Sequence, residues 1–221
     1  MDQSPAAAAS AAEALRAGSP PDPADALRVG SPPALTAAER ASLLRLARAG
    51  VEAAVRGSTA PVLDGDRVTP GLSAPRAAFV TLRDRDGELR GCIGNLDDER
   101  PTWANVAVAA RSAAIRDPRF PPVRPSELDD LVIDVNVLGD PVPLPDPALF
   151  DPVVHGVIVE RDGRRGLLLP NVGPPLGWGA EETLEAVCLK AGLRADAWRR
   201  EGTHRRVFAT TEFAEGADPP G

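Results

Sequence analysis

Two of the three Asp-Gly dipeptides in this chain, Asp86-Gly87 and Asp162-Gly163, constrain its fold more than any other feature of the sequence. Asp-Gly between two runs of strand-forming residues favours a tight turn that returns the chain antiparallel to itself. The flanking runs have this character, so the sequence predicts one β-hairpin over residues 77–96 and another over residues 155–169. Both hairpins require antiparallel pairing of neighbouring strands.

Helical patterns separate the predicted strands. Thr36 and Glu39 have the spacing of a capping box, and apolar residues follow them at helical intervals. Pro101 suits the first turn of another helix, because the missing N–H is not needed there. Helices are expected over residues 36–57, 101–117 and 180–191, and further strands over residues 131–138 and 206–213. Helices interspersed with hairpins predict an α+β (mixed α/β) fold.

The first 35 residues differ in composition from the remainder of the chain. They are mainly Ala, Pro, Ser, Gly and Asp, and they contain few side chains large enough to offset the entropy of ordering. We therefore expect a disordered extension over residues 1–35, a domain over residues 36–213 and a frayed tail over residues 214–221. Hydrophobic residues make up 43% of the chain, which is enough for the domain to form a core.

Charge and cysteine content narrow the class of protein. The net charge of −7 and the pI of about 5.0 argue against binding to nucleic acid or to anionic membranes. No run of residues is apolar enough to span a bilayer, and the first residues lack the pattern of a secretory signal. Two cysteines in 221 residues are too few for a disulfide scaffold, so we expect a reduced, cytoplasmic protein.

The run from Leu89 to Gly94, Leu-Arg-Gly-Cys-Ile-Gly, is the first candidate site. Side chains alternate between the faces of a strand, so Leu89 and Ile93 would face the core while Arg90 and Cys92 face the opposite side. The arginine would favour the thiolate form of Cys92, and Gly94 would leave room for a ligand. Cys92 is therefore a candidate nucleophile, ligand or redox thiol. The alternative is that Cys92 is a small buried residue and Arg90 a surface ion-pair partner.

The two histidines and the second cysteine differ in their surroundings. His155 lies beside a glycine at the start of a strand, where it could act as a base for Cys92 or be a structural residue. His204 lies among charged residues, as is typical of a solvated surface. Cys188 lies on the apolar face of the last expected helix, which predicts core packing. The spacing of His and Cys matches no metal site, so we expect no metal and no cofactor.

The segment from Arg116 to Pro122 is the second candidate site. It holds Arg116, Asp117, Arg119 and Phe120 among three prolines. Two arginines, an aspartate and an aromatic ring in a proline-stiffened loop could bind an anion or another protein. The alternative is a rigid connection between helix and strand, with a local ion pair between Arg116 and Asp117.

Several segments together resemble one family. They are Leu89–Gly94, Arg116–Pro122, Val154–Val157, Leu168–Val172 with Gly177-Trp178, and Cys188–Leu193. The chain is similar to the AMMECR1 domain family, in its bacterial and archaeal form known from the AmmeMemoRadiSam system. The resemblance covers approximately residues 36–213.

The resemblance implies a larger and a smaller subdomain with a cleft between them. The run containing Arg90, Gly91, Cys92 and Gly94 would line this cleft, with the two glycines allowing a ligand or partner to approach. Members of the family are encoded near a radical SAM protein and a Memo-like protein, which implies that these proteins act in one pathway.

Two functional hypotheses follow from the residues and the resemblance. The first is a thiol-bearing accessory or enzyme component, with Cys92 as nucleophile or redox thiol, Arg90 as its activator or an anion clamp, and His155 as general base. The second is a non-catalytic module that binds a protein or small ligand through the cleft and the loop from Arg116 to Pro122. A role in nucleic-acid binding is disfavoured by the negative charge.

Overall fold

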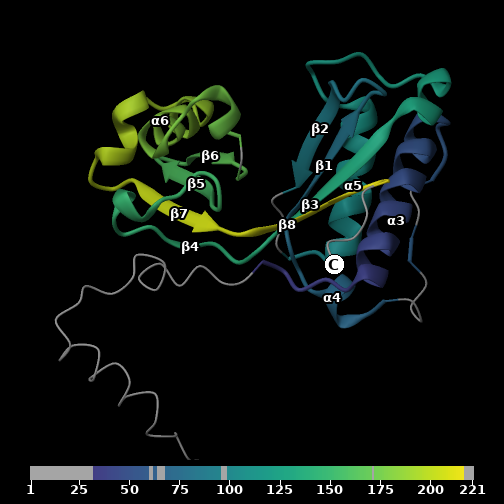
Figure 1. Ribbon diagram of the computed structural model, residues 1–221, viewed down its shortest axis with the longest axis horizontal. Helices are drawn as coiled ribbons and strands as arrows, with labels where there is room; N and C mark the ends of the chain where they lie inside the picture. The colour runs from purple at the N-terminus through teal and green to yellow at the C-terminus, as the bar shows by residue number, and fades with distance from the viewer. Residues whose placement is uncertain (1–31, 60–61, 64–67, 96–98, 171, 217–221) are drawn as a thin grey trace, which may run out of the picture.

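Two four-stranded antiparallel sheets, each packed against helices, form two lobes (Figure 1). The computed structural model describes residues 32–59, 62–63, 68–95, 99–170 and 172–216. The expected N-terminal extension lies outside the described residues except for residues 32–35, and so do residues 217–221. The predicted α+β fold with two subdomains is confirmed.

The larger lobe is built on the sheet with strand order β2-β1-β3-β8. Helices α3 and α5 pack on one face of this sheet and enclose the larger hydrophobic core. The elements of this lobe are α3 (Ala37–Val55), α4 (Pro70–Ser73), β1 (Ala78–Arg83), β2 (Leu89–Asn95), α5 (Thr102–Ile115), the 3-10 helix η2 (Pro125–Asp130), β3 (Val132–Leu138) and β8 (Thr210–Ala214).

The smaller lobe is built on the sheet with strand order β4-β7-β5-β6. Helix α6 and the 3-10 helix η5 pack on one face of this sheet and enclose a second core. The elements of this lobe are β4 (Val142–Pro143), η3 (Pro147–Leu149), β5 (Gly156–Arg161), β6 (Arg164–Leu168), η4 (Pro174–Leu176), α6 (Ala180–Lys190), η5 (Ala195–Arg199) and β7 (His204–Phe208).

Local sequence signals produce the first helix and both hairpins as predicted. The Thr36 hydroxyl accepts a hydrogen bond from the Glu39 amide at 3.2 Å, and the Glu39 carboxylate accepts one from the Thr36 amide at 2.8 Å, which completes the capping box of α3. In the β5–β6 turn, Asp162 and Gly163 both have a left-handed backbone, with φ of 51° and 70°. This geometry belongs to the tight turns that Asp-Gly favours.

The end of the chain differs from the sequence-based expectation. We predicted one strand over residues 206–213, whereas the structure has two strands in different sheets: β7 in the smaller lobe and β8 in the larger. The break falls at Ala209, whose carbonyl accepts a hydrogen bond from the Gly139 amide at 2.8 Å. The C-terminal segment therefore crosses between the lobes, as Figure 1 shows.

The packed chain extends beyond residues 36–213 at both ends. Leu35 is only 6% exposed, and the Thr211 hydroxyl donates to the Pro33 carbonyl at 2.7 Å. At the other end, Ala214 pairs with Asp134 in the ladder between β3 and β8. Large apolar and strand-forming residues near the boundaries join the core and the sheet, although the composition around them favours disorder or fraying.

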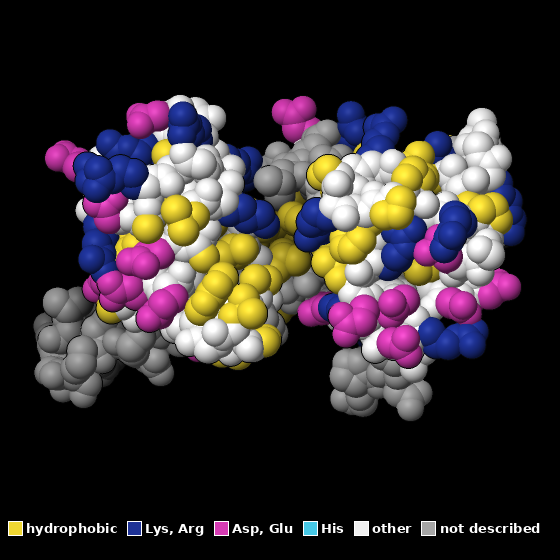
Figure 2. Space-filling view, turned by 90° about the horizontal axis from the view of Figure 1, so that it is seen from above, with side chains coloured by type: hydrophobic (Ala, Val, Ile, Leu, Met, Phe, Trp, Pro, Cys, Tyr) yellow, Lys and Arg dark blue, Asp and Glu magenta, His cyan; other side chains and the backbone are white. Residues whose placement is uncertain are grey.

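A third hydrophobic cluster joins the two lobes. Phe208 is fully buried in it with Ile158 and Leu167 of the smaller sheet, and Phe79 of β1 packs against it from the larger sheet. The sheets thus meet through the faces that their own helices do not cover. Figure 2 shows a hollow between the lobes with hydrophobic side chains at its base and Lys or Arg side chains on either side.

Candidate functional site

Cys92 lies on the face of β2 that points away from helix α5. It stands opposite Thr81 of β1, and the Thr81 hydroxyl donates a hydrogen bond to the Cys92 sulfur at 3.3 Å. Its neighbour Gly91 lies on the other face, directly against the backbone of α5. Cys92 is half-buried on the sheet face turned towards the smaller lobe, as the alternation of faces predicts. The expectation that Leu89 faces the core is wrong: a register shift between Leu82 and Arg83 pairs Leu89 with Arg83, and Leu89 is 37% exposed.

The buried carboxylate of Asp117 holds the backbone of Cys92. Asp117 accepts a hydrogen bond from the Cys92 amide at 2.8 Å, and Arg119 donates to the Cys92 carbonyl at 3.3 Å. The same guanidinium binds both carboxylate oxygens of Asp117, at 3.0 and 2.7 Å. These hydrogen bonds from Arg119, above all, hold the pKa of Asp117 well below its usual range, so the carboxylate stays charged.

The loop that carries Asp117 is therefore part of the cysteine site. The expected ion pair between Arg116 and Asp117 is replaced by the pair between Asp117 and Arg119, because Arg116 ends helix α5 and remains exposed. The Arg119 guanidinium also lies 5.5 Å from the centre of the Phe120 ring, a distance typical of a cation–π contact. Two of the sequence-predicted candidate segments thus meet at one place.

Arg90 is held by a carboxylate. Its guanidinium binds Glu127 of η2 at 2.8 and 3.3 Å and donates to the Pro121 carbonyl at 3.0 Å. The hydrogen bonds from Arg90 lower the pKa of Glu127 to about 2, which keeps this partner charged. Arg90 therefore fastens β2 to the loop that follows Asp117, and the guanidinium bound to Cys92 is that of Arg119.

Lys190 is the last residue of helix α6 in the smaller lobe. Desolvation lowers the pKa of Lys190, the charge of Cys92 acts to raise it, and the charge of Arg119 acts to lower it. The electrostatic influence of Cys92 and Arg119 on its pKa is the observation that links Lys190 to this site. Sequence reasoning missed this residue; the available signal was that Lys190 is the only lysine among 25 basic residues.

His155 is held by its own loop. The Asp151 amide donates to the His155 Nδ1 at 3.3 Å, and burial is the main cause that lowers the pKa of His155. Among the described residues, no contact joins the His155 ring to Cys92. The assignment of His155 as a base for Cys92 thus has no geometric support, and it stays a prediction.

Protein atoms occupy the space beside Gly91 and Gly94, the two glycines of the run. A Cβ on Gly91 would lie 2.4 Å from the Ala113 carbonyl oxygen, and one on Gly94 would lie 2.2 Å from the Phe79 ring. The absence of a side chain at Gly91 allows β2 to approach α5. The absence of a side chain at Gly94 allows the Phe79 ring of β1 to lie against β2. The space that we expected Gly94 to leave for a ligand is occupied by Phe79.

The remaining titratable candidates belong to the core or the surface. Cys188 is fully buried, and burial raises the pKa of its thiol, so the predicted core role is confirmed. His204 lies exposed on β7. Within the described ranges, no three His, Cys, Asp or Glu side chains gather as they would around a metal ion. None of the described helices is long and apolar enough to cross a membrane.

The chain is similar to archaeal and bacterial proteins along most of its length. It is 44% identical to a protein of Methanothermobacter thermautotrophicus, over 80% of this chain and 94% of that one. It is 45% identical to a protein of Thermotoga maritima, over 58% of this chain and 78% of that one. The crystal structure of the uncharacterized protein PH0010 from Pyrococcus horikoshii matches with a TM-score of 0.72 and 36% identity, over 79% of this chain and 90% of that one.

A sequence model of the AMMECR1 family matches residues 44–213, which include the Cys92 strand, the Asp117 loop and Lys190. The larger and smaller lobes, with the hollow between them in Figure 2, agree with the subdomains that the resemblance implied. The chain belongs to the AMMECR1 family.

Proposed function

We propose that this protein is a thiol-dependent component of a reaction in which Cys92 acts as the nucleophile at the cleft between the lobes. One observation carries the proposal: the buried Asp117 carboxylate binds the backbone amide of Cys92, and its exposed partner Arg119 binds the Cys92 carbonyl. A residue whose peptide is held in this way keeps its backbone in position, which helps to orient a reacting group.

The charges around the thiol support the same function. In this proposal the cations of the site are Arg119, which donates to the Cys92 carbonyl, and Lys190, whose pKa responds to the charge of Cys92. The thiolate is the reactive form of cysteine. The activating role that we assigned to Arg90 from the sequence is extended in this proposal to Arg119 and Lys190, while the Arg90 guanidinium is bound to Glu127.

Alkylation of the native protein by iodoacetamide, followed by mass spectrometry, tests this proposal. At neutral pH, Cys92 should be modified while the fully buried Cys188 is not. Lys190→Gln should slow the modification of Cys92 several-fold, and Lys190→Arg should restore most of the rate because it keeps the charge. Arg111→Gln, which changes an arginine of α5 outside the site, is the matched control. Failure of Cys92 to react in the native state would refute the proposal.

The proposed partners are a radical SAM protein and a Memo-like protein, as the family resemblance implies. In this scheme the protein supplies the thiol for a pathway shared by the three. Purified candidates from the same genome should bind the wild-type chain and the Cys92→Ser variant equally, whereas the joint reaction should require Cys92. Equal joint activity of wild type and Cys92→Ser would exclude the thiol-dependent role.

The second candidate function is a binding module without catalysis. It is favoured by the contact between the exposed Arg119 guanidinium and the Phe120 ring, which presents a cation and an aromatic face together. Under this alternative, Phe120→Ala would weaken partner recovery in a pull-down while Cys92→Ser would leave the function intact. The two candidate functions thus predict opposite results for Cys92→Ser in the joint assay.

A further inference from the structure

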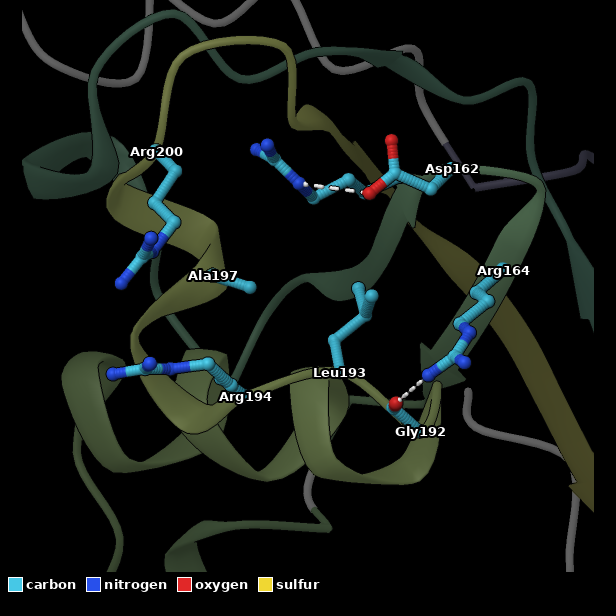
Figure 3. A pocket seen from close by; sticks show the side chains of 8 residues that line it. Asp162, Arg164, Gly192, Leu193, Arg194, Ala197 and Arg200 are labelled. Atoms are coloured by element: carbon cyan, nitrogen blue, oxygen red, sulfur yellow. Dashed lines mark hydrogen bonds and ion pairs between the residues drawn. The ribbon is translucent and has the colours of Figure 1, made fainter.

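A cavity of about 450 Å³ lies on the smaller lobe, between the turn of the β5–β6 hairpin and the segment that follows α6 (Figure 3). Its walls carry four arginines, and its apolar surface comes from Leu193 and Ala197, which lie between the arginines in Figure 3. Neither Cys92 nor Arg119 lines it. The four arginines are Arg161, Arg164, Arg194 and Arg200.

The arginines of this pocket outnumber the carboxylates that bind them. Asp162 pairs with Arg161 at 3.3 Å. The Asp196 carboxylate is shared by Arg194 at 3.2 Å and Arg200 at 2.8 Å. Four guanidinium groups therefore meet two carboxylates, which leaves an excess of two positive charges on a chain whose net charge is −7.

Arg164 is the arginine without a carboxylate partner in the described part of the chain. Its guanidinium donates to the Gly192 carbonyl, which fixes it at the rim of the pocket, as Figure 3 shows. Among the described residues, the guanidinium groups of Arg164, Arg194 and Arg200 each make one hydrogen bond to protein. A guanidinium carries five N–H donors, so most of these donors are directed to solvent or to a ligand.

We propose that this pocket binds the phosphate group of a small organic phosphomonoester. A phosphomonoester carries nearly two negative charges at neutral pH, which match the two excess positive charges. The fork of a guanidinium fits the oxygens of a phosphate bidentately. The organic part of the ligand would lie on Leu193 and Ala197, and the volume suits a small molecule.

Isothermal titration calorimetry with phenyl phosphate tests this proposal, because the probe combines a phosphate dianion with an apolar ring. Arg164→Gln should weaken binding about tenfold, since it removes a charge-assisted contact. Arg165→Gln is the matched control, because Arg165 is the next residue on the same strand and lies outside the pocket. Asp196→Asn should strengthen binding, because it removes a carboxylate that competes for two arginines.

Two further measurements test whether the pocket prefers a phosphate dianion and whether it is separate from the Cys92 site. Benzenesulfonate, a monoanion of similar shape, should bind more weakly than phenyl phosphate, and Cys92→Ser should bind phenyl phosphate as the wild type does. Equal affinities for Arg164→Gln and Arg165→Gln, with both variants folded by circular dichroism, would overturn the proposal. Binding of single-stranded RNA or an acidic peptide without binding of phenyl phosphate would also overturn it.

Discussion

Asp117 and Glu127 join the cysteine strand to the loop beside it through charge. Asp117 binds the Cys92 amide and Arg119, while Glu127 binds Arg90 and the Arg124 amide. Each carboxylate is thereby stabilised in its charged form, so protonation must loosen the loop from the strand. The geometry around Cys92 depends on ionised carboxylates.

We predict that the protein loses stability as the pH falls from about 4.5 to about 2, partly through Glu127. The pKa of Glu127 is lowered from 4.5 to about 2 in the folded protein, so its contribution is present above pH 4.5 and is lost as the carboxylate protonates. Glu127→Gln should cost about 2 kcal/mol at neutral pH and flatten this acid dependence. Urea unfolding across this pH range measures both effects.

Glu52→Gln is the matched control for this prediction. Glu52 forms an exposed pair with Arg56 within α3, at 3.3 Å, and exposed pairs contribute little to stability. An acid dependence of Glu127→Gln that equals that of the wild type would show that the pair between Glu127 and Arg90 does not stabilise the fold.

The placement of Arg90 and Cys92 on one strand face could be predicted from the sequence, because side-chain alternation is a local rule. The partners of these residues could not be predicted in the same way. Glu127 is 37 positions from Arg90. Lys190 belongs to another lobe with a separate core, so local patterns in the sequence do not predict its position relative to Cys92. The periodicity of a sequence shows which residues share a face of a helix or strand. It does not show which of these faces pack against one another.

At the scale of elements, close contact between strand β2 and helix α5 positions the Cys92 site. In the larger lobe, Gly91 of β2 lies against the Ala113 carbonyl of α5, and in the smaller lobe Gly166 of β6 lies against the Val187 carbonyl of α6. Each glycine lets a helix backbone approach its sheet more closely than a side chain would allow. The packing of α5 against Gly91 therefore fixes the distance between this helix and the strand that carries Cys92.

Gly91→Ala should destabilise the protein by about 3 kcal/mol, because the added Cβ would lie 2.4 Å from a backbone oxygen that cannot rotate away. Displacement of β2 should also slow alkylation of Cys92. Leu89→Ala, on the same strand at an exposed position, should cost less than about 1 kcal/mol. Thermal and urea unfolding of the two variants would contradict this account if their stabilities were equal.

Local turn chemistry explains which elements could be predicted. Asp-Gly at both hairpins and the capping box of α3 are short signals, and each forms as expected. The division of the last strand at Ala209 has no Gly or Pro signal. Phe208 and Phe213 are five positions apart, and an uninterrupted strand would put them on opposite faces. The break lets each join a separate core.

At the scale of the whole molecule, we propose that the two lobes contribute to one site. The larger lobe carries Cys92 and Arg119, the smaller lobe carries Lys190, and the cluster around Phe208 joins the two lobes. Changes at this junction should therefore act on the thiol from a distance. The central claim of this account is that Lys190 lies beside Cys92 in the folded protein.

A short amine-to-thiol cross-linker tests that claim directly, because Lys190 is the only lysine of the chain and Cys188 is buried. Mass spectrometry of the native protein treated with the reagent should reveal a peptide pair joining Lys190 to Cys92, absent from Cys92→Ser and from protein treated in urea. Reaction of both residues with the reagent without formation of this cross-link would contradict the account.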